Sequence, residues 1–449
     1  MNQNKWARIL ILAFVLSAPQ LRAQEATPFS LQQAMDYAKQ HNYAMINSRA
    51  DIEISKSKIL ETTSIGLPQI SGEVGFQNFI NIPTQVIPAS AFNPAADSDE
   101  LMPVQFGTKW NATAGIQASQ LIFDGAYIVG LQASKTFAQL SKNQLGKTEN
   151  DVKADVSQAY YTVLVAGENI KILMQSLANS QKLLNETREI YKSGFIEESD
   201  VDQLTLLVLN IKNSISRSER QLNLSYKLLK LQMGMDINEN ITVSETLQDI
   251  IGKINIESLY NQEFQLSGHV EYKLAQTNKN LMQLNLRRER VAYLPSVGAF
   301  FSHQESAFRN QFNFFEGIRP WYPGTIWGIN MTIPIFDSGM KYARTKQAKL
   351  EYEKATTSAE FAEQSLKLQA QNSKADLVDA FDRLNVEKQN LVLAEKIQNK
   401  TMVKYQEGLS TSLDLNQVQN QYLNTQGNYI NTLFELLSAK TRFDKAMSF

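Results

Sequence analysis

The chain has no cysteine among its 449 residues. This absence excludes disulfides, thiolate metal sites, catalytic thiols and a lipid anchor on an N-terminal cysteine. Histidine is scarce as well, since only His41, His269 and His303 occur and no two of them have the spacing of metal ligands. The sequence also contains no Ser/His/Asp arrangement, no phosphate-binding glycine loop and no metal constellation. It therefore predicts that the protein is not an enzyme and that it has no cofactor and no metal site.

Neither sign of charge is in excess. The 44 basic and 45 acidic residues leave a formal net charge of −1, which gives no electrostatic reason to expect nucleic-acid binding. The 43% of hydrophobic residues suffice for a large core. Beyond the N-terminal region, however, no apolar run is long enough for a membrane-spanning helix. If the mature chain enters a membrane, it must do so with the strands of a β-barrel.

Residues 1–23 read as a signal peptide. Lys5 and Arg8 form a basic start, Ile9 to Ala18 form an apolar run, and Ala23 offers a small residue for cleavage.

Proline is confined to two later segments. After Pro28 it occurs only between residues 68 and 103 and between residues 295 and 334. Because proline interrupts helix interiors, the two proline-free tracts can be helical, and the two proline-containing segments are predicted to hold strands and loops. Both segments end with a similar motif, Phe123-Asp124-Gly125 in the first and Phe336-Asp337-Ser338-Gly339 in the second. These motifs are predicted to be the junctions between strand and helix.

Four stretches alternate between apolar and polar residues, which is the period of a strand with one apolar face. The apolar positions are Ile70, Val74 and Phe76; Trp110, Ala112, Ala114, Ile116 and Ala118; Val297, Ala299 and Phe301; and Trp327, Ile329, Met331, Ile333 and Ile335. Phe300 is an exception on the polar face. Each segment is predicted to be a β-hairpin with a long loop, at 68–123 and 295–336, with strands of about ten residues that match a bilayer. Burial in a soluble sheet is the alternative explanation for the aromatic residues near the strand ends.

The longest predicted helix runs from Met340 to Glu407, a stretch without Gly or Pro. It would be roughly 100 Å long and would end at Gly408, which can adopt the left-handed C-cap conformation. Ser412 and Asp414 are N-cap candidates for a returning helix. Apolar residues recur every seven positions here, with an interruption at Gln398, and in an equivalent region about 214 residues earlier. These heptads predict two elongated helical hairpins, at 125–233 and 339–447.

The predicted domain plan is therefore two repeats after the signal peptide. The first, 24–255, contains a helix over Leu31–Thr63, a β-hairpin, a helical hairpin and a connecting segment at 234–255. The second, 256–449, contains a helix over Ile256–Val291 followed by the same two hairpins.

Four strands per chain cannot close a barrel, and open strand edges are not tolerated in lipid. Two copies would give about eight strands, whose interior side chains fill, and three copies would give twelve, with room for a lumen. The polar strand faces and the long helices favour three copies, although composition alone does not choose the trimer. The predicted fold class is mainly α with membrane β-strands, a trimeric 12-stranded barrel that continues into a long α-helical barrel.

A strand, Phe-Asp-Gly or a close variant, a long helix, Tyr-x-x-Gly and a returning helix occur twice after the signal peptide. In this organisation the sequence resembles the TolC-like outer membrane efflux proteins, from about Phe29 to Met447. The resemblance implies a homotrimer in the lipid of the Gram-negative outer membrane, with its helical part in the periplasm. It also implies a periplasmic adaptor protein and an inner-membrane pump of the RND or ABC type as partners. The implied function is an exit duct for efflux or type I secretion, and drugs, metals and proteins all remain open as cargo.

The resemblance further implies roles for the tips of the helical hairpins. Asp200, Tyr405, Asp414, Ser199, Ser410 and Gln417 would form a gate and pore constriction, and Tyr191, Gly194, Gly408 and Ser412 would dock the adaptor. Tyr405 would bond to Asp200 across the closed tip, and a threefold ring of Asp414 would favour cations. Capping of the returning helices is the alternative explanation for both aspartates.

This sequence departs from the family pattern in two places. Ser410 stands where some members carry an arginine that tethers the closed tip, and Gln417 stands where some carry a second pore aspartate. A non-channel surface or structural coiled-coil protein, such as an adhesin, is the alternative reading. It fits the heptads but not the four alternating strands.

Overall fold

The computed structural model describes residues 27–94, 97, 99–317 and 319–447, so the predicted signal peptide lies outside the described residues. The chain divides into two compact units. One contains residues 51–142 and 274–360 and is called the sheet unit. The other contains residues 27–50, 143–273 and 361–447 of the described chain and is called the helical unit. Helices α3 (Tyr43–Ile65), α4 (Gly125–Lys192), α8 (Val270–Val291) and α9 (Met340–Gln406) contribute residues to both.

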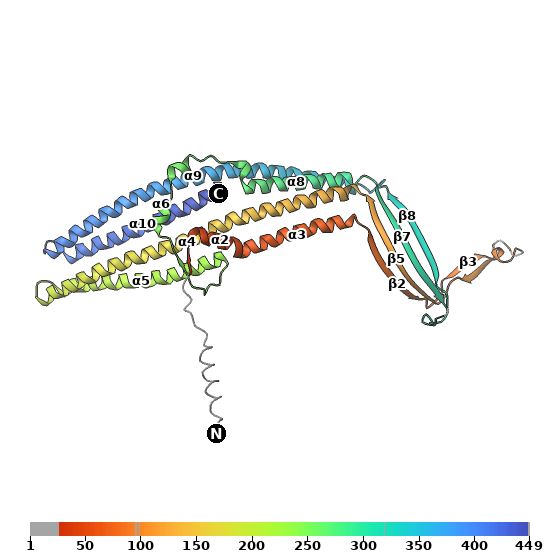
Figure 1. Ribbon diagram of the computed structural model, residues 1–449, viewed down its shortest axis with the longest axis horizontal. Helices are drawn as coiled ribbons and strands as arrows, with labels where there is room; N and C mark the ends of the chain where they lie inside the picture. The colour runs from red at the N-terminus through yellow and green to blue at the C-terminus, as the bar shows by residue number, and fades with distance from the viewer. Residues whose placement is uncertain (1–26, 95–96, 98, 318, 448–449) are drawn as a thin grey trace, which may run out of the picture. The chain divides into compact units, whose positions relative to one another are not determined.

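The sheet unit is built on a four-stranded antiparallel sheet in the order β2-β5-β7-β8 (Figure 1). Its strands are β2 (Gln69–Asn78), β5 (Trp110–Phe123), β7 (Ser296–Arg309) and β8 (Tyr322–Thr332). The two predicted hairpins pair as expected, and β5 and β7 join them side by side. Strands β2 and β8 are therefore the edges of the sheet.

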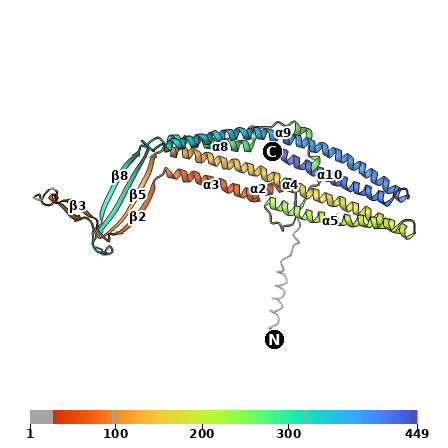
Figure 2. The same cartoon turned by 180° about the vertical axis from the view of Figure 1, so that it is seen from behind.

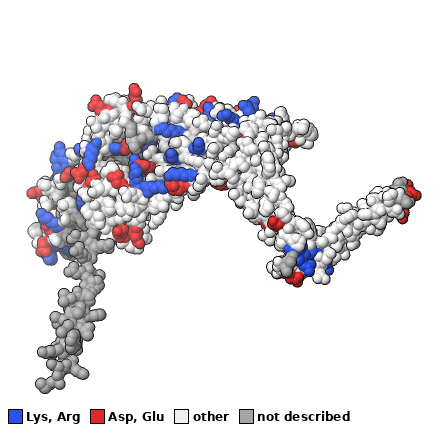
Figure 3. Space-filling view, turned by 45° about the vertical axis from the view of Figure 1, so that its right-hand side comes forward, with Lys and Arg blue, Asp and Glu red and all other residues white. Residues whose placement is uncertain are grey.

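The pleat of the sheet separates an apolar face from a polar face, because directly opposed residues lie on the same side. The apolar face carries Ile70, Val74, Phe76, Ala112, Ala114, Ile116, Ala118, Phe301, Trp327, Ile329 and Met331. The polar face carries Ser71, Glu73, Gln77, Thr113, Gln117, Ser302, Gln304 and Asn330. Most of the apolar face is bare within the chain, since Val74 is 86% exposed and Trp327 76%, but its end near the long loops is covered, since Ala112 and Ala307 are buried. Figure 3 shows few charged side chains on the side of the sheet that it presents.

Several side chains break this pattern, since Arg309 lies on the apolar face and Phe308 and Ile326 lie on the polar face. Phe300, which the alternation places on the polar face, lies over Gly328, where an added Cβ would come within 3.0 Å of its ring. His303 and Glu305 lie on the apolar face, and the His303 Nδ1 atom is 2.8 Å from the Thr325 hydroxyl of the neighbouring strand.

The sheet unit differs from the prediction in two places. The first loop contains a hairpin of its own, formed by β3 (Thr84–Pro88) and β4 (Leu101–Gln105), with a 3-10 turn at Ala89–Ala91. The expected strand over Trp327–Phe336 instead starts at Tyr322 and ends at Thr332. Pro334 explains the early end because it has no backbone N–H to donate to a ladder, and Pro323 is tolerated because β8 is an edge strand.

The helical unit contains the long helices of both repeats. Helix α4 packs beside α5 (Glu198–Met233), and α9 lies beside α10 (Ser412–Met447), as Figures 1 and 2 show from opposite sides. The short parallel pair of β1 (Thr27–Phe29) and β6 (Ile241–Val243) lies in the same unit, together with α2 (Leu31–His41), α6 (Leu247–Gly252), α7 (Ile256–Tyr260) and a 3-10 turn at Leu266–Gly268. The segment predicted as a connection at 234–255 thus contains both a strand and a helix.

The core of the helical unit follows the heptad positions. Val156, Val163, Leu377, Leu436 and Phe443 are at most 2% exposed and belong to one large cluster. A second cluster near the hairpin tips includes Leu184, Leu204, Val208 and Leu415.

Two predicted helices are interrupted. The helix expected over Leu31–Thr63 breaks at Asn42, whose extended backbone ends α2. The Asn42 amide donates to the Gln232 carbonyl at 2.7 Å, and its oxygen accepts from the Ala44 N–H at 2.8 Å, which caps α3. The helix expected over Ile256–Val291 breaks between α7 and α8.

Candidate functional site

Aspartate side chains form both strand-to-helix junctions of the sheet unit. Asp124 follows Phe123, the last residue of β5, and its carboxylate accepts from the Tyr127 N–H at 2.7 Å, so it caps α4. Asp337 accepts from the N–H groups of Gly339 and Lys341 at 3.2 and 3.0 Å. The two junctions therefore share a capping carboxylate. The first helix begins at Gly125, whereas Phe336 precedes a turn whose Gly339 has a φ of +85°.

The first hairpin tip joins α4 to α5. Gly194 takes a φ of +80°, a left-handed conformation that glycine adopts without strain, and its N–H donates to the Tyr191 carbonyl at 2.9 Å. Glu197 is the N-cap of α5, and the Asp200 carboxylate completes the capping box by accepting from the Glu197 N–H at 3.3 Å. Ser199 donates to Glu197 at 3.4 Å.

The second tip, between α9 and α10, repeats this geometry. Gly408 has a φ of +70°, and its N–H donates to the Tyr405 carbonyl at 3.0 Å. Ser412 was expected as an N-cap but is the first residue of α10, and Thr411 takes the capping position. The Asp414 N–H donates to the Thr411 hydroxyl at 3.1 Å, and the Thr411 N–H donates to Asp414 at 3.1 Å. Asp414 therefore closes a capping box, and it also accepts from the Ser410 hydroxyl at 3.3 Å.

Several side-chain hydrogen bonds join the two hairpins near their tips. The Ser412 hydroxyl donates to the Asp200 carboxylate, and the Asn416 amide donates to Gln203 at 3.1 Å. The Tyr405 hydroxyl shares a hydrogen bond of 3.3 Å with Thr187, and Gln406 donates to Glu186 at 3.3 Å.

The expected bond from Tyr405 to Asp200 is thus replaced by two others. The phenol pairs with Thr187, whose side chain is fully buried, and the carboxylate takes the nearer Ser412 hydroxyl. Burial raises the pKa of Tyr405; the Thr187 hydroxyl opposes this shift, and the charge of Asp200 adds to it. The tyrosine therefore stays protonated and able to donate.

Asp414 and Gln417 point to the exposed side of α10, three residues apart and so on neighbouring turns of one face. The Thr411 hydroxyl, and then its backbone N–H, hold the pKa of Asp414 below its ordinary value. Asp414 is therefore a fixed negative charge at neutral pH. Nothing in the structure gives it a partner from the other hairpin among the described residues.

Several residues that form the tips were not predicted from the sequence: Glu186, Thr187, Glu197, Gln203, Thr411 and Asn416. Thr411-Ser412-Leu413-Asp414 is a capping-box pattern, so the true N-cap of α10 was recognisable. The cross-hairpin partners carry no comparable local signal.

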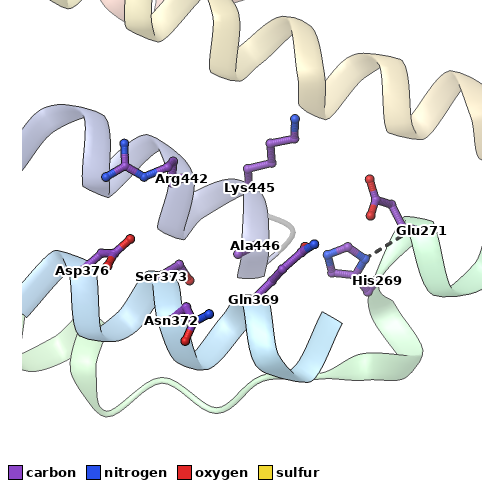
Figure 4. A pocket seen from close by; sticks show the side chains of 9 residues that line it. All are labelled: His269, Glu271, Gln369, Asn372, Ser373, Asp376, Arg442, Lys445 and Ala446. Atoms are coloured by element: carbon purple, nitrogen blue, oxygen red, sulfur yellow. Dashed lines mark hydrogen bonds between the residues drawn. The ribbon is translucent and has the colours of Figure 1, made fainter. Parts of the chain in front are cut away.

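A separate cavity of about 280 Å³ lies in the helical unit, between α9, α10 and the start of α8 (Figure 4). His269 precedes α8 and caps it, because its Nδ1 atom accepts from the Glu271 N–H at 3.3 Å. Burial lowers the pKa of His269, so its ring is neutral. Arg442, Lys445 and Asp376 also line this cavity.

Within the described ranges, no helix is both long and apolar enough to cross a bilayer. The same residues contain no group of three or more acidic or histidine side chains arranged to hold a metal ion.

A sheet with one bare apolar face, joined to two long capped helical hairpins, defines the protomer class of outer-membrane channels. The model of the outer membrane efflux protein family matches residues 99–234 and 272–448, which is more than half of the chain. The chain belongs to the outer membrane efflux protein family. The resemblance seen in the sequence is thereby confirmed, and so is the mainly α fold with a β part. The protein accordingly resides in the outer membrane, with its helical domain in the periplasm, and its family consists of channel proteins rather than enzymes.

Individual relatives support this assignment. The chain is 19% identical to outer membrane protein TolC of Vibrio cholerae over 418 residues, covering 93% of this chain and 90% of TolC. The crystal structure of VceC from Vibrio cholerae has a TM-score of 0.71 at 14% identity, covering 93% of this chain and 96% of VceC. The open state of the MtrE outer membrane channel of Neisseria gonorrhoeae has a TM-score of 0.72 at 15% identity, covering 93% of this chain and 88% of MtrE. These structures share the fold.

Proposed function

We propose that three copies of this chain form a passive exit duct in a tripartite efflux or type I secretion system. The observation that carries the proposal is the sheet, which is open at both edges and apolar on one bare face. Open edges are not tolerated in lipid, so β2 of one copy must pair with β8 of the next. Three sheets closed in this way give a twelve-stranded barrel whose polar face lines a lumen.

The same assembly brings the hairpin tips of three copies together as a gate. The bonds from Ser412 to Asp200 and from Tyr405 to Thr187 hold the two hairpins of each protomer against each other. Opening then requires a rearrangement of helices that breaks these bonds. Three copies of the ionised Asp414, free of cross-hairpin partners, form a carboxylate ring that attracts cations. Gln417, one turn further along, adds no charge to this filter.

The tips also supply a docking surface for a periplasmic adaptor protein, which in turn connects the duct to an inner-membrane pump of the RND or ABC type. Each tip glycine is followed by a bare apolar side chain, Phe195 at 83% exposure in one tip and Leu409 at 77% in the other. An adaptor that covered the tips would remove both side chains from water.

The first experiment measures the mass and the planar-bilayer conductance of the mature protein in detergent. A trimer with a small, cation-selective conductance is expected. Asp414→Asn should lower the cation selectivity, and Gln417→Ala, which removes no charge from the same face, should leave it unchanged. A monomer or dimer without conductance would contradict the duct and would favour the non-channel coiled-coil protein instead.

A further inference from the structure

Three buried polar side chains form a hydrogen-bonded layer across α4, α9 and α10, above the tip contacts. The Gln398 amide on α9 donates to the Gln419 oxygen on α10 at 2.7 Å. The Gln419 amide donates in turn to the Ser176 hydroxyl on α4 at 3.1 Å. Gln398 is 6% exposed, and Gln419 and Ser176 are each 4% exposed. The layer is therefore buried inside the protein and does not belong to its solvent-exposed surface.

The layer stands where the heptad pattern calls for apolar residues. Gln398 continues the series Leu377, Leu384 and Leu391, and it is the residue that interrupts it. The tip cluster beside it is apolar, with Leu173, Leu177, Met402, Leu415 and Leu423 among its members. A buried polar layer is usually less stable than an apolar one of the same shape. The best-attested use of such a layer is to fix one register between packed helices, because any shift leaves a buried polar group without a hydrogen-bond partner.

The two bonds of this layer have different tasks. The bond from Gln398 to Gln419 joins the two helices of one hairpin, so it can stay intact when that hairpin moves as a body. The bond from Gln419 to Ser176 joins this hairpin to the other one. Ser176 is the only member of the layer on α4, so a single neutral hydrogen bond carries the cross-hairpin link. Any movement of α9 and α10 relative to α4 must break it.

We propose that Gln419 is a positioning residue for the gate: through Ser176 it holds the α9–α10 hairpin in the tip packing seen here, and through Gln398 it makes that hairpin move as one piece. This inference rests on the gated duct proposed above and adds to it a control point inside the helices. A net hydrogen bond of this kind shifts an equilibrium by about two- to tenfold per protomer.

The test uses Ser176→Ala, which removes the cross-hairpin bond without adding bulk. Its matched control is Ser218→Ala, because the Asn169 amide donates to the Ser218 hydroxyl at the same 3.1 Å but links α4 to α5 within one hairpin. In planar bilayers, Ser176→Ala should raise the open probability about two- to tenfold per protomer while the thermal midpoint of unfolding stays close to that of Ser218→Ala. An open probability equal to that of the control would overturn the proposal.

A second measurement does not require a channel. Deuterium uptake by the tip segments 183–205 and 400–418 should rise in Ser176→Ala and stay at the parent level in Ser218→Ala. If the parent protein conducts no ions, the duct fails, and the exchange data alone decide whether Gln419 positions the tip. Equal uptake in the two variants would overturn that role as well.

Discussion

Asp200 and Asp414 are a natural pair for testing the gate, because they occupy equivalent positions in the two tips. Each carboxylate closes the capping box of its returning helix, by accepting from the N–H of Glu197 in one case and of Thr411 in the other. They differ across the hairpins. Asp200 also accepts from the Ser412 hydroxyl of the opposite hairpin, whereas the partners of Asp414 are local. Replacing either by alanine removes the carboxylate that closes a capping box, but only the replacement of Asp200 also removes a hydrogen bond between the hairpins.

The size of the difference follows from that bond. Loss of the cap costs about 1 kcal/mol in either variant. A hydrogen bond to a carboxylate contributes ~1.5–3 kcal/mol when buried, and the partial exposure of Asp200 reduces this to about 1 kcal/mol. Asp200→Ala should therefore favour the open tip about fivefold more per protomer than Asp414→Ala does.

Open probability in planar bilayers measures this difference directly. Asp414→Ala changes the ion selectivity as well, but that readout is separate from the fraction of time spent open. Equal open probabilities in the two alanine variants would refute the reasoning, because the cross-hairpin bond would then contribute nothing to closure.

Two further predictions concern stability. Because burial lowers the pKa of His269, the unfolded chain binds its proton more tightly, and stability should fall as the pH drops below about 6.5 and level off below the folded-state pKa. His269→Asn keeps a capping acceptor that does not titrate, so its midpoint of thermal unfolding should change less between about pH 7.5 and 5.5 than that of the parent protein. If the midpoints of the two proteins change equally with pH, His269 is not the cause of the pH dependence. Phe443→Ala should lower the free energy of unfolding by ~3–5 kcal/mol because the ring is fully buried. Arg442→Ala, at the exposed neighbouring residue, is the control. A midpoint of thermal unfolding no lower for Phe443→Ala than for Arg442→Ala would contradict this prediction.

The long helices and their ends could be predicted because their causes are local. Gly194 and Gly408 stand where left-handed backbone is needed, and heptads mark the buried side of each helix. The four strands were predictable for the same reason, since alternation records which side is apolar. The pairing of β5 with β7 is different. It joins residues about 190 positions apart, and no local pattern specifies it.

The errors occurred where a single side chain acts over a distance. The local sequence around Asn42 is compatible with a continuing helix. The helix breaks there, and the Asn42 amide donates to the distant Gln232 carbonyl. The small β3–β4 hairpin was expected to be part of a long loop, and Pro88 and Pro103 lie within its strands. Proline is tolerated there because this ribbon has only edge strands.

The glycine turn and the capping aspartate of each tip were predicted, but the predicted bond between Tyr405 and Asp200 is replaced by other bonds. Resemblance supplied Tyr405 and Asp200 as partners, but the packing of the helices decides which hydroxyl reaches which acceptor. The donors that join the hairpins, Ser412 and Asn416, both lie on the second repeat, and their acceptors, Asp200 and Gln203, both lie on the first.

The repeat offset of 214 residues explains this one-sidedness. At that offset, Ser412 corresponds to Glu198 and Asn416 corresponds to Asp202. Both counterparts are acids, which accept hydrogen bonds when ionised and cannot donate them. The first repeat therefore has no equivalent donors to offer to Asp414 and Gln417. Because the two repeats differ at these two positions, Asp200 is bonded between the hairpins and Asp414 stays exposed. An exposed charge is what the proposed pore requires of Asp414.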